Sequence, residues 1–306
     1  MLRTMLVALS KIRKILSGNT VKSVNPRNGN ARNFCVSPRK SKFKFEEMAV
    51  ASKNNMASVP FLYHSLQSIL DVFEKPENKT RDAVRELLNI YERAKEEKSK
   101  HDAAGEVRSH PFIVLEGLDG SGKSTTGTKF AKKIGAKKWQ TPPASISHIR
   151  HLFDDDKVLR TAYYSLGNYI AGLEVEIMLK DQPIVMDRYW HSTAAYAMVQ
   201  WIHDNKGKYE MPPAGDEIYC WPDDLFKPDI VFFLDVSEQV RAQRLSRRTE
   251  STAQEDLLRS STEFRSNVIK AYKNMYNPPV TVINSNFAFG RVLRELQDRT
   301  KDLLVE

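Results

Sequence analysis

The clearest chemistry in the sequence belongs to a glycine-dense turn, GLDGSGKS, at residues 117–124. It matches the pattern G-x-x-x-x-G-K-[ST] and stands between an apolar run, FIVLE, and a basic stretch with helical character. Glycines allow successive backbone N–H groups to point into one concave nest, and the dipole of the following helix adds positive potential. In such a loop the lysine, Lys123, reaches the outer phosphates of a nucleotide, and the hydroxyl of Ser124 can bind Mg²⁺. We therefore predict a phosphate-binding loop made of consecutive residues: Gly117, Leu118, Asp119, Gly120, Ser121, Gly122, Lys123, Ser124 and Thr125.

A second pair of chemically active side chains, Asp187 and Arg188, follows the apolar run PIVM. Parallel sheets bind their ligands at the carboxyl ends of the strands, and this pair would stand at such an end. A surface ion pair is the alternative. Two adjacent opposite charges directly after a buried strand are better placed against a metal ion and a phosphate. We predict that Asp187 faces Mg²⁺ and that Arg188 faces a phosphate.

The phosphate-binding loop alone does not distinguish a GTPase from an ATPase or a kinase. A GTPase needs an N-K-x-D element to recognise guanine, and the nearest string, NKGK at residues 205–208, lacks the aspartate. The sequence therefore disfavours a GTPase.

The elements that must position these residues follow an alternating pattern. Strand-like apolar runs cover residues 112–117, 183–189, 229–236 and 280–285, with long helical segments between them. Such alternation is typical of an α/β protein whose doubly wound parallel sheet carries helices on both faces.

Two further helical patterns precede the first strand, one ending before Pro76 and one starting near Thr80. We expect this helical extension to pack on the main domain. Its charged end, ERAKEEKSKHD, is predicted to be a solvated helix face rather than a binding site.

Charge is unevenly distributed along the chain. The 306 residues carry a formal net charge of +9, but residues 1–45 hold eleven Lys and Arg and no Asp or Glu, which leaves 36 basic and 38 acidic residues beyond them. The net charge alone would favour a nucleic-acid binder, but the nearly neutral body of the chain argues against one.

The basic segment at residues 1–45 opens with apolar residues at helical spacing, among them Leu2, Met5 and Leu9. A basic, acid-free, amphipathic start is typical of an organelle transit peptide. A disordered basic tail is the alternative, and ARNF at residues 31–34 is a weak candidate for a cleavage site.

Membrane and redox chemistry have little support in the sequence. No run approaches the roughly 18 apolar residues that span a bilayer. The two cysteines, Cys35 and Cys220, cannot form a disulfide framework or a metal site. We expect a reducing interior and no redox catalysis.

Three strings carry a resemblance to a known family: Asp119 inside the phosphate-binding loop, DRYWHSTAAY at residues 187–196, and PDIVFFLDVSEQVRAQRLSRR at residues 228–248. Together they resemble the thymidylate-kinase family of nucleoside monophosphate kinases, from Phe112 to the C-terminus. Within that family, the strings SLGNY and WPDDLFKPD are most similar to mitochondrial kinases that act on UMP and CMP.

The resemblance implies a P-loop kinase fold and three parts of the chain: a mitochondrial transit peptide or disordered segment at 1–45, a linker and helical extension at 46–110, and the kinase domain at 111–306. It implies phosphoryl transfer from ATP, with Mg²⁺, to CMP, UMP, dCMP or dUMP in mitochondrial nucleotide synthesis or salvage, in the matrix. Another organelle is the alternative location. The partners would be these small molecules and not nucleic acid. The resemblance leaves undecided whether the protein forms a homodimer.

Two other activities remain as alternatives. One is a thymidylate kinase that acts mainly on dTMP. The other is an ATP-binding interaction module without catalysis, which the intact set of Lys123, Ser124, Asp187 and Arg188 disfavours.

The family's site residues map onto individual positions of this chain. Lys123 and Arg188 would be catalytic, and Arg188 would hold both the acceptor phosphate and the transferring group. Asp119 would accept a hydrogen bond from the 3′-hydroxyl of the acceptor sugar. Asp187 would position magnesium through water, beside the hydroxyl of Ser124.

Two tyrosines would contact the acceptor nucleoside. Tyr164 stands where the family stacks an aromatic ring on the pyrimidine, with a core aromatic as the alternative because Tyr163 is adjacent. Tyr196 stands where the family's tyrosine flanks the 2′ position of the sugar, and there it would favour deoxynucleotides.

The chain departs from the family at two acceptor positions. Asn168 stands where thymidylate kinases have an arginine, four residues after the stacking aromatic. Arginine only donates, which suits the O4 atom of thymine or uracil, whereas an Asn amide also accepts. We predict that Asn168 lets one pocket take both uracil and cytosine. The family's acceptor-phosphate arginine falls on Ala144, and we expect Arg150 to replace it, with Arg160 as the competing candidate.

The last candidates are arginines in the string RLSRRTES. Position 120 is glycine, where some family members carry an arginine, so the resemblance implies that a mobile lid supplies the catalytic arginine. Arg248 is the leading lid candidate. Arg244 is expected to pack against adenine as part of the ATP site, and a solvated helix end is the alternative role for Arg247.

Overall fold

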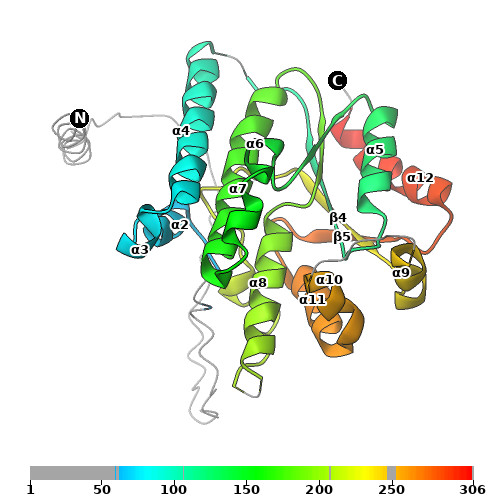
Figure 1. Ribbon diagram of the computed structural model, residues 1–306. Helices are drawn as coiled ribbons and strands as arrows, with labels where there is room; N and C mark the ends of the chain where they lie inside the picture. The colour runs from blue at the N-terminus through cyan, green and yellow to red at the C-terminus, as the bar shows by residue number, and fades with distance from the viewer. Residues whose placement is uncertain (1–58, 60–61, 106, 207, 247–252, 305–306) are drawn as a thin grey trace, which may run out of the picture. The chain divides into compact units, whose positions relative to one another are not determined.

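Residues 59, 62–105, 107–206, 208–246 and 253–304 are described by the computed structural model of the chain (Figure 1). They belong to one compact unit that extends from Ala51 to Glu306. The predicted leader and the arginines Arg247 and Arg248 lie outside the described residues. In the described part of the chain, no helix combines the length and the apolar character needed to cross a membrane.

Five parallel strands form one sheet in the order β2-β3-β1-β4-β5. They are β1 (Phe112–Glu116), β2 (Lys137–Gln140), β3 (Ile184–Asp187), β4 (Ile230–Asp235) and β5 (Val280–Asn284). The prediction of an α/β fold with a parallel sheet is confirmed. The sequence missed β2, because its residues KKWQ lie at a sheet edge and remain exposed or half-buried, so they form no apolar run.

The central strand β1 is buried along its whole length, and its side chains alternate between two apolar cores. Ile113 and Leu115 enter the core covered by α5 (Lys123–Lys133) and α12 (Phe289–Thr300). Phe112 and Val114 enter the larger core on the other face. Burial on both faces explains why the strand reads as a continuous apolar run.

The larger core is covered by three long helices: α7 (Lys157–Met178), α8 (Trp190–Asp204) and α11 (Thr262–Asn274). The remaining elements of the kinase region are short: α6 (Ala144–Ser147), η1 (Arg150–Phe153), η2 (Glu217–Tyr219), α9 (Glu238–Leu245), α10 (Ala253–Ser260) and η3 (Lys301–Leu303). Because all strands are parallel, their carboxyl ends meet at one edge. The register that pairs Leu115 with Asp187 places the end of β3 beside the start of the glycine-rich loop.

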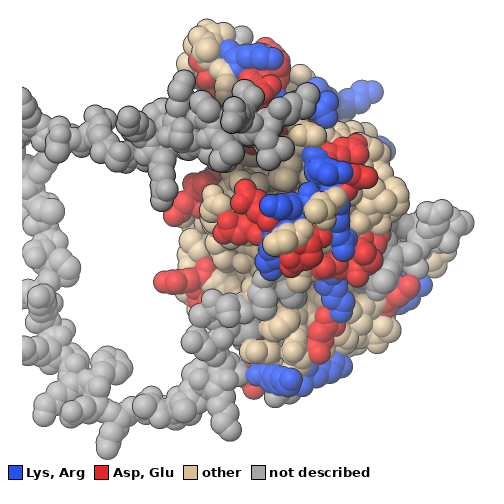
Figure 2. Space-filling view, turned by 60° about the vertical axis from the view of Figure 1, so that its left-hand side comes forward, with Lys and Arg blue, Asp and Glu red and all other residues tan. Residues whose placement is uncertain are grey.

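The helical extension consists of α2 (Leu66–Phe73), α3 (Pro76–Lys79) and α4 (Asp82–Ala103). We predicted two helices, and the additional short turn α3 begins at Pro76, since proline is favoured at the start of a helix. Along α4, the apolar side chains of Val84, Leu87 and Tyr91 are buried in the larger core, where α4 packs along α7. Lys and Arg lie among Asp and Glu over this side of the molecule in Figure 2, as expected of a solvated face.

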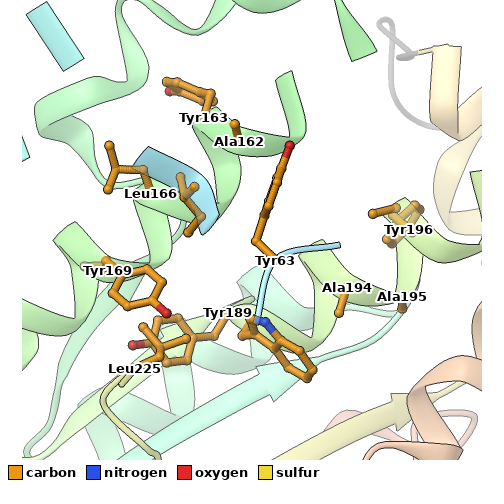
Figure 3. Packing of buried hydrophobic residues seen from close by; sticks show 14 of the residues in the cluster. Tyr63, Ala162, Tyr163, Leu166, Tyr169, Tyr189, Ala194, Ala195, Tyr196 and Leu225 are labelled. Carbon is orange, nitrogen blue, oxygen red and sulfur yellow. The ribbon is translucent and has the colours of Figure 1, made fainter. Parts of the chain in front are cut away.

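Tyr63, which precedes α2, is inserted into the body of the protein. In Figure 3 its ring lies between Ala162 and Leu166 of α7 and Ala194 of α8, and it is 6% exposed. Its hydroxyl donates to the carbonyl of Val158 at 3.5 Å. The extension thus supplies part of the same core as the sheet.

Candidate active site

The glycine-rich loop joins β1 to α5, and Gly120 is the position at which it contacts α9. Gly120 has φ +84°, in the left-handed region, and a Cβ atom there would lie 3.0 Å from Arg241 Cγ, Arg241 O and Leu245 Cγ. Arg241 is itself fully buried and donates to the carbonyl of Asp119 at 3.3 Å. Helix α9 therefore closes over the loop, and an arginine at position 120 does not fit this packing.

Backbone carbonyl oxygens behind the glycine-rich loop accept hydrogen bonds from an arginine and a serine side chain. Arg244 donates to Ser121 O at 2.8 Å and to Ser285 O at 2.9 Å, and the Ser285 hydroxyl donates to Ser121 O at 2.8 Å. Pairing these oxygens with the protein keeps them from repelling a bound phosphate. Burial lowers the pKa of Arg244. Its predicted packing against adenine stays a prediction, next to the observed contact with the loop.

Lys123 is 6% exposed, and its Nζ donates to the carbonyls of Gly117 and Leu118 at 2.8 and 2.9 Å. Burial and the nearby Arg188 charge lower the pKa of Lys123 to about 8, although Asp187 and two other carboxylates act in the opposite direction. A buried ammonium group whose hydrogen bonds go to backbone carbonyls favours binding of an anion. The site is thus prepared for phosphate.

The Ser124 hydroxyl donates to Asp187 Oδ2 at 2.6 Å, at the meeting point of α5 and β3. A hydroxyl and a carboxylate are the oxygen ligands that Mg²⁺ prefers, and protein Mg²⁺ sites commonly use one or two such groups with the phosphates of the substrate. The described residues hold no cluster of three or more His, Cys, Asp or Glu that could bind a metal ion. Ser124 and Asp187 therefore fit Mg²⁺ bound together with a nucleotide.

Arg188 connects the loop to the opposite wall of the site. It follows β3 with φ 65°, an uncommon conformation for a residue other than glycine, and its guanidinium pairs with Asp119 Oδ1 at 2.5 Å. It also donates to Ser192 Oγ at 3.1 Å and lies 5.6 Å from the centre of the Tyr196 ring. The Thr141 hydroxyl donates to its carbonyl at 3.0 Å. These contacts fix Arg188 between the glycine-rich loop and the first turns of α8.

Glu116 is a buried carboxylate beside Arg188 that the sequence analysis missed. It is fully buried at the end of β1 and accepts hydrogen bonds from Tyr189 N at 2.8 Å, Ser192 N at 3.2 Å and Ser192 Oγ at 2.5 Å. Burial raises the pKa of its carboxyl group, while the Ser192 hydrogen bond and the Arg188 charge act in the opposite direction. Glu116 holds the start of α8, and with it the backbone next to Arg188. The sequence does contain a signal for this residue, because Glu116 is the only charged residue of the otherwise apolar run FIVLE and stands at its end.

Two cavities meet at this point. One, of about 210 Å³, lies over the phosphate loop and Lys123, Ser124 and Asp187. The other, of about 270 Å³, extends away between α7 and α8. The second cavity is lined by aromatic and polar side chains that include Arg160, Tyr164, Thr193, Tyr196 and Gln200. Both cavities are bounded by Asp119, Thr141 and Arg188. We call them the donor cavity and the acceptor cavity.

The predicted acceptor residues occupy different positions around the acceptor cavity. Tyr164 and Tyr196 line it, and the buried Tyr196 hydroxyl has no hydrogen-bond partner among the described residues. Arg160 also lines it. Arg150 instead donates to the Tyr164 hydroxyl at 2.8 Å and pairs with Asp154 at 3.2 Å, outside the lining. The structure thus brings Arg160 to the cavity directly and Arg150 through Tyr164.

Asn168 lies behind the cavity wall. It is 1% exposed and is not one of the lining residues. Its Nδ2 donates to Thr193 Oγ1 at 3.0 Å, and its buried Oδ1 has no partner among the described residues. Thr193, which the sequence analysis did not single out, stands between Asn168 and the cavity.

The family model of thymidylate kinase matches residues 115–295, which include every site element described above. The chain belongs to the thymidylate kinase family. The resemblance seen in the sequence is confirmed. Human mitochondrial UMP-CMP kinase 2 is 39% identical over 184 residues, which are 60% of this chain and 40% of the human protein. The chain thus aligns with less than half the length of that relative.

Two other members of the thymidylate kinase family align over a larger share of their own length. A probable thymidylate kinase of Sulfurisphaera tokodaii is 28% identical over 160 residues, which are 48% of this chain and 74% of that protein. The solved structure of thymidylate kinase from Candida albicans has a TM-score of 0.49 and 18% identity, over 63% of this chain and 92% of that chain.

Proposed function

We propose that this protein is a nucleoside monophosphate kinase that transfers the γ-phosphoryl group of ATP to a pyrimidine nucleoside monophosphate. The observation that carries the proposal is the pair of cavities that share Asp119, Thr141 and Arg188. One cavity offers a phosphate loop, and the other offers aromatic and polar side chains. A nucleoside triphosphate hydrolase needs no pocket for a second substrate beside the phosphate loop, because water is its acceptor. A kinase needs such a pocket for the acceptor molecule.

The reaction needs positioning and charge neutralisation more than covalent help from the protein. An oxygen of the acceptor phosphate, already anionic, forms a bond to the γ-phosphorus while the bond to the β,γ-bridging oxygen breaks, so no general base is needed. Lys123 neutralises charge on the donor phosphates, and Arg188 holds the acceptor phosphate and the transferring group. Mg²⁺, when bound by Ser124 and Asp187 with the nucleotide, would neutralise charge on the phosphates. Arg248 remains our candidate for a lid arginine.

A pyrimidine acceptor is supported by the contents of the acceptor cavity and by the name of the human relative. Tyr164 offers an aromatic face for stacking on the base. The unpaired hydroxyl of Tyr196 offers a partner for the sugar, where it would favour deoxynucleotides. We propose CMP, UMP, dCMP and dUMP as acceptors, with dTMP as the main acceptor in the alternative case.

A mitochondrial location is proposed on two grounds. The first 45 residues are basic and free of acidic residues, and the human relative is named mitochondrial. A fusion of the full chain to a fluorescent protein should colocalise with a matrix marker, and a fusion that lacks residues 1–45 should not. Equal distribution of both fusions would contradict the proposal.

The function is tested by measuring ADP formation in a coupled assay with CMP, UMP, dCMP, dUMP and dTMP as acceptors and AMP as the purine control. We expect turnover with the cytosine and uracil nucleotides that exceeds turnover with AMP by at least about a hundredfold, the scale of discrimination available to a polar pocket. Dominant turnover of dTMP would favour the alternative acceptor. Absence of transfer to every monophosphate would contradict the kinase proposal.

A further inference from the structure

Tyr63 lies between the two helices that contribute most of the residues lining the acceptor cavity. Thr161 of α7 and Thr193 of α8 line that cavity, and Tyr63 does not. Ala162 and Ala194, the next residues on the two helices, lie beside the Tyr63 ring (Figure 3). The ring is 6% exposed, although Tyr63 precedes the family match at residues 115–295. A residue outside the matched region is thus packed between the walls of the cavity.

Hydrogen bonds hold the start of the extension against α7. The Tyr63 hydroxyl donates to the carbonyl of Val158, in the first turn of that helix, at 3.5 Å. Three residues later, Leu66 N donates to Asp224 Oδ2 at 2.8 Å. The other oxygen of this carboxylate accepts from the Tyr169 hydroxyl of α7 at 2.5 Å. The segment at residues 63–66 is therefore joined to the first turn of α7 directly and to its middle through Asp224.

The same segment also contacts the start of α8. The His64 ring lies 5.8 Å from the ring of Trp190, which is the first residue of α8 and follows Arg188 by two residues. His64 Nδ1 donates to the carbonyl of Cys220 at 3.2 Å. None of the residues that residues 63–66 contact in these interactions lines the donor cavity. The contacts therefore concern the acceptor side of the site.

The extension makes two further contacts, with the chain between β2 and α7, and both are exposed. Glu86 pairs with His148 at 2.7 Å, and Arg81 pairs with Asp155 at 3.6 Å. Exposed pairs of this kind contribute little to stability. Removing a buried ring instead leaves a space that neighbouring elements partly fill by moving, because protein cores are close-packed. We therefore look to Tyr63 for an effect on the cavity.

We propose that Tyr63 is a positioning residue of the acceptor cavity, whose ring sets the separation of α7 and α8 and with it the fit of the acceptor nucleotide. The inference rests on the proposed function. Tyr164 on α7 and Tyr196 on α8 both line the cavity, so a change in the separation of the helices moves one relative to the other. The donor cavity, over the glycine-rich loop, should not respond.

Two substitutions of Tyr63 separate its ring from its hydroxyl. Tyr63→Phe keeps the ring and removes a long hydrogen bond, whereas Tyr63→Leu removes the ring. We expect Tyr63→Leu to raise the KM for CMP and for dUMP by about tenfold, since a misplacement of about 1 Å can cost up to about a hundredfold in rate. Tyr63→Phe should keep these values within about twofold of the wild type, and both variants should keep the KM for ATP within about twofold. Unchanged acceptor KM values in Tyr63→Leu, or an equal rise in its KM for ATP, overturn the proposal.

Tyr219→Leu is the matched control for the loss of a buried ring. Tyr219 is fully buried, its hydroxyl donates to the carbonyl of Pro212 at 2.8 Å, and it lines neither cavity. Both leucine variants should unfold at a lower temperature than the wild type, but Tyr219→Leu should keep every KM within about twofold. An equal rise in the acceptor KM of Tyr219→Leu means that loosening of the core alone has this effect, which overturns the proposal.

Asp224→Asn is a second test that leaves the apolar core unchanged. The asparagine keeps only one of the two oxygens that accept from Leu66 N and from the Tyr169 hydroxyl, so one of these hydrogen bonds is lost. We expect the acceptor KM to rise by about threefold. Asp216→Asn is the control, since Asp216 accepts from Ile218 N at 3.0 Å and lines neither cavity. An unchanged acceptor KM in Asp224→Asn, or an equal rise in Asp216→Asn, overturns the proposal.

Direct binding keeps this test apart from the proposed function. The affinity of CMP for the wild type and for Tyr63→Leu is measured by calorimetry without ATP. If no assay shows transfer but Tyr63→Leu binds CMP about tenfold more weakly than the wild type, the kinase proposal fails and the inference is supported. If transfer occurs and the two proteins bind CMP equally, only the inference fails.

Discussion

The donor and acceptor cavities are built in opposite ways. The donor cavity is lined mainly by one continuous segment, residues 117–125, and is completed by residues at the ends of β2 and β3. Carbonyl oxygens of this segment are paired by Arg244, Lys123 and Ser285. The acceptor cavity is assembled from side chains of separate segments: the loop, the residues after β2, helix α7, the turn after β3, and helix α8. Polar groups in its wall, such as the Tyr196 hydroxyl, are buried without partners among the described residues.

This difference separates two kinds of recognition. A loop of backbone N–H groups and one lysine suits the phosphates of any nucleoside triphosphate, and a change in one of its residues alters the whole loop. Side chains from separate helices can be changed one at a time without moving the others. We therefore propose that the acceptor cavity determines selectivity for the substrate and that the donor cavity provides the capacity for transfer.

The strongest test of this division is Lys123→Met. We expect kcat to fall by about a thousandfold or more for every acceptor alike, because the lysine neutralises charge that develops on the transferring group. Thermal unfolding should show a folded protein, and CMP binding should be retained. A loss that differs greatly between CMP and UMP would contradict the division between the two cavities.

The donor loop should also be the less tolerant of added volume. Gly120→Ala places a methyl group 3.0 Å from Arg241 and Leu245, and we expect the free energy of unfolding to fall by about 2–4 kcal/mol, from strain and overpacking together. Gly135→Ala is the matched control, because Gly135 also has a positive φ, +68°, with nothing within 4 Å of the added carbon. Its cost should be only the backbone strain, about 1 kcal/mol. If urea denaturation shows equal decreases in the free energy of unfolding for the two variants, the close contact between α9 and the loop does not contribute.

Glu116 holds the backbone beside Arg188, which borders both cavities, so a Glu116 variant should affect transfer more than binding. In Glu116→Gln one carboxylate oxygen becomes an NH₂ group that faces donors of α8, and we expect kcat to fall by about twentyfold through displacement of Arg188, with little change in either KM. Glu174→Gln is the control, since Glu174 accepts hydrogen bonds from Trp139 and Ser145 at 3.0 Å, away from both cavities. A similar fall of kcat in the control would mean that loss of any hydrogen-bonded carboxylate of the core has this effect.

Within the acceptor cavity, the two candidate arginines should differ. Arg160→Ala should raise the KM of the acceptor by about tenfold, whereas Arg150→Ala, which acts through the Tyr164 hydroxyl, should raise it by about threefold. The KM of ATP should be constant in both. The reverse order would restore Arg150 as the principal contact of the acceptor phosphate.

The smallest expected effect is the uptake of protons that accompanies ATP binding. The pKa of Lys123 is about 8 without nucleotide, and bound phosphates favour its charged form, so ATP binding raises this pKa and takes up a proton. The uptake should reach about 0.7 proton at pH 8.5 and decline toward pH 7, where Lys123 is already charged. Calorimetry in two buffers of different ionisation enthalpy measures it, with Lys129→Met on the same helix as the control. Release of protons, or no buffer dependence, would contradict the lowered pKa.

The donor cavity was largely predictable, because most of its lining residues belong to one segment whose pattern is typical of a phosphate-binding loop. The strand β1 was predictable because both of its faces are buried, and the edge strand β5 because its residues VTVI are largely apolar. The other edge strand, β2, was not predictable, because its residues KKWQ include two lysines and form no apolar run. The acceptor cavity was only partly predictable. Tyr164 and Tyr196 could be located by resemblance, but the contact of Asn168 with Thr193, and of Glu116 with the start of α8, depends on how helices pack across the sheet. No local pattern encodes those distances.

The position of Tyr63 changes where the chain should be divided in experiments. The sequence favours a kinase domain that begins at residue 111, but a fragment cut there loses the ring inserted between α7 and α8. It also exposes to water the face of α7 on which α4 packs. The lost tyrosine alone corresponds to about 2 kcal/mol of apolar burial. We therefore propose that the smallest fragment able to refold begins upstream of Val59, and that residues 62–105 are an internal part of the enzyme rather than an appendage.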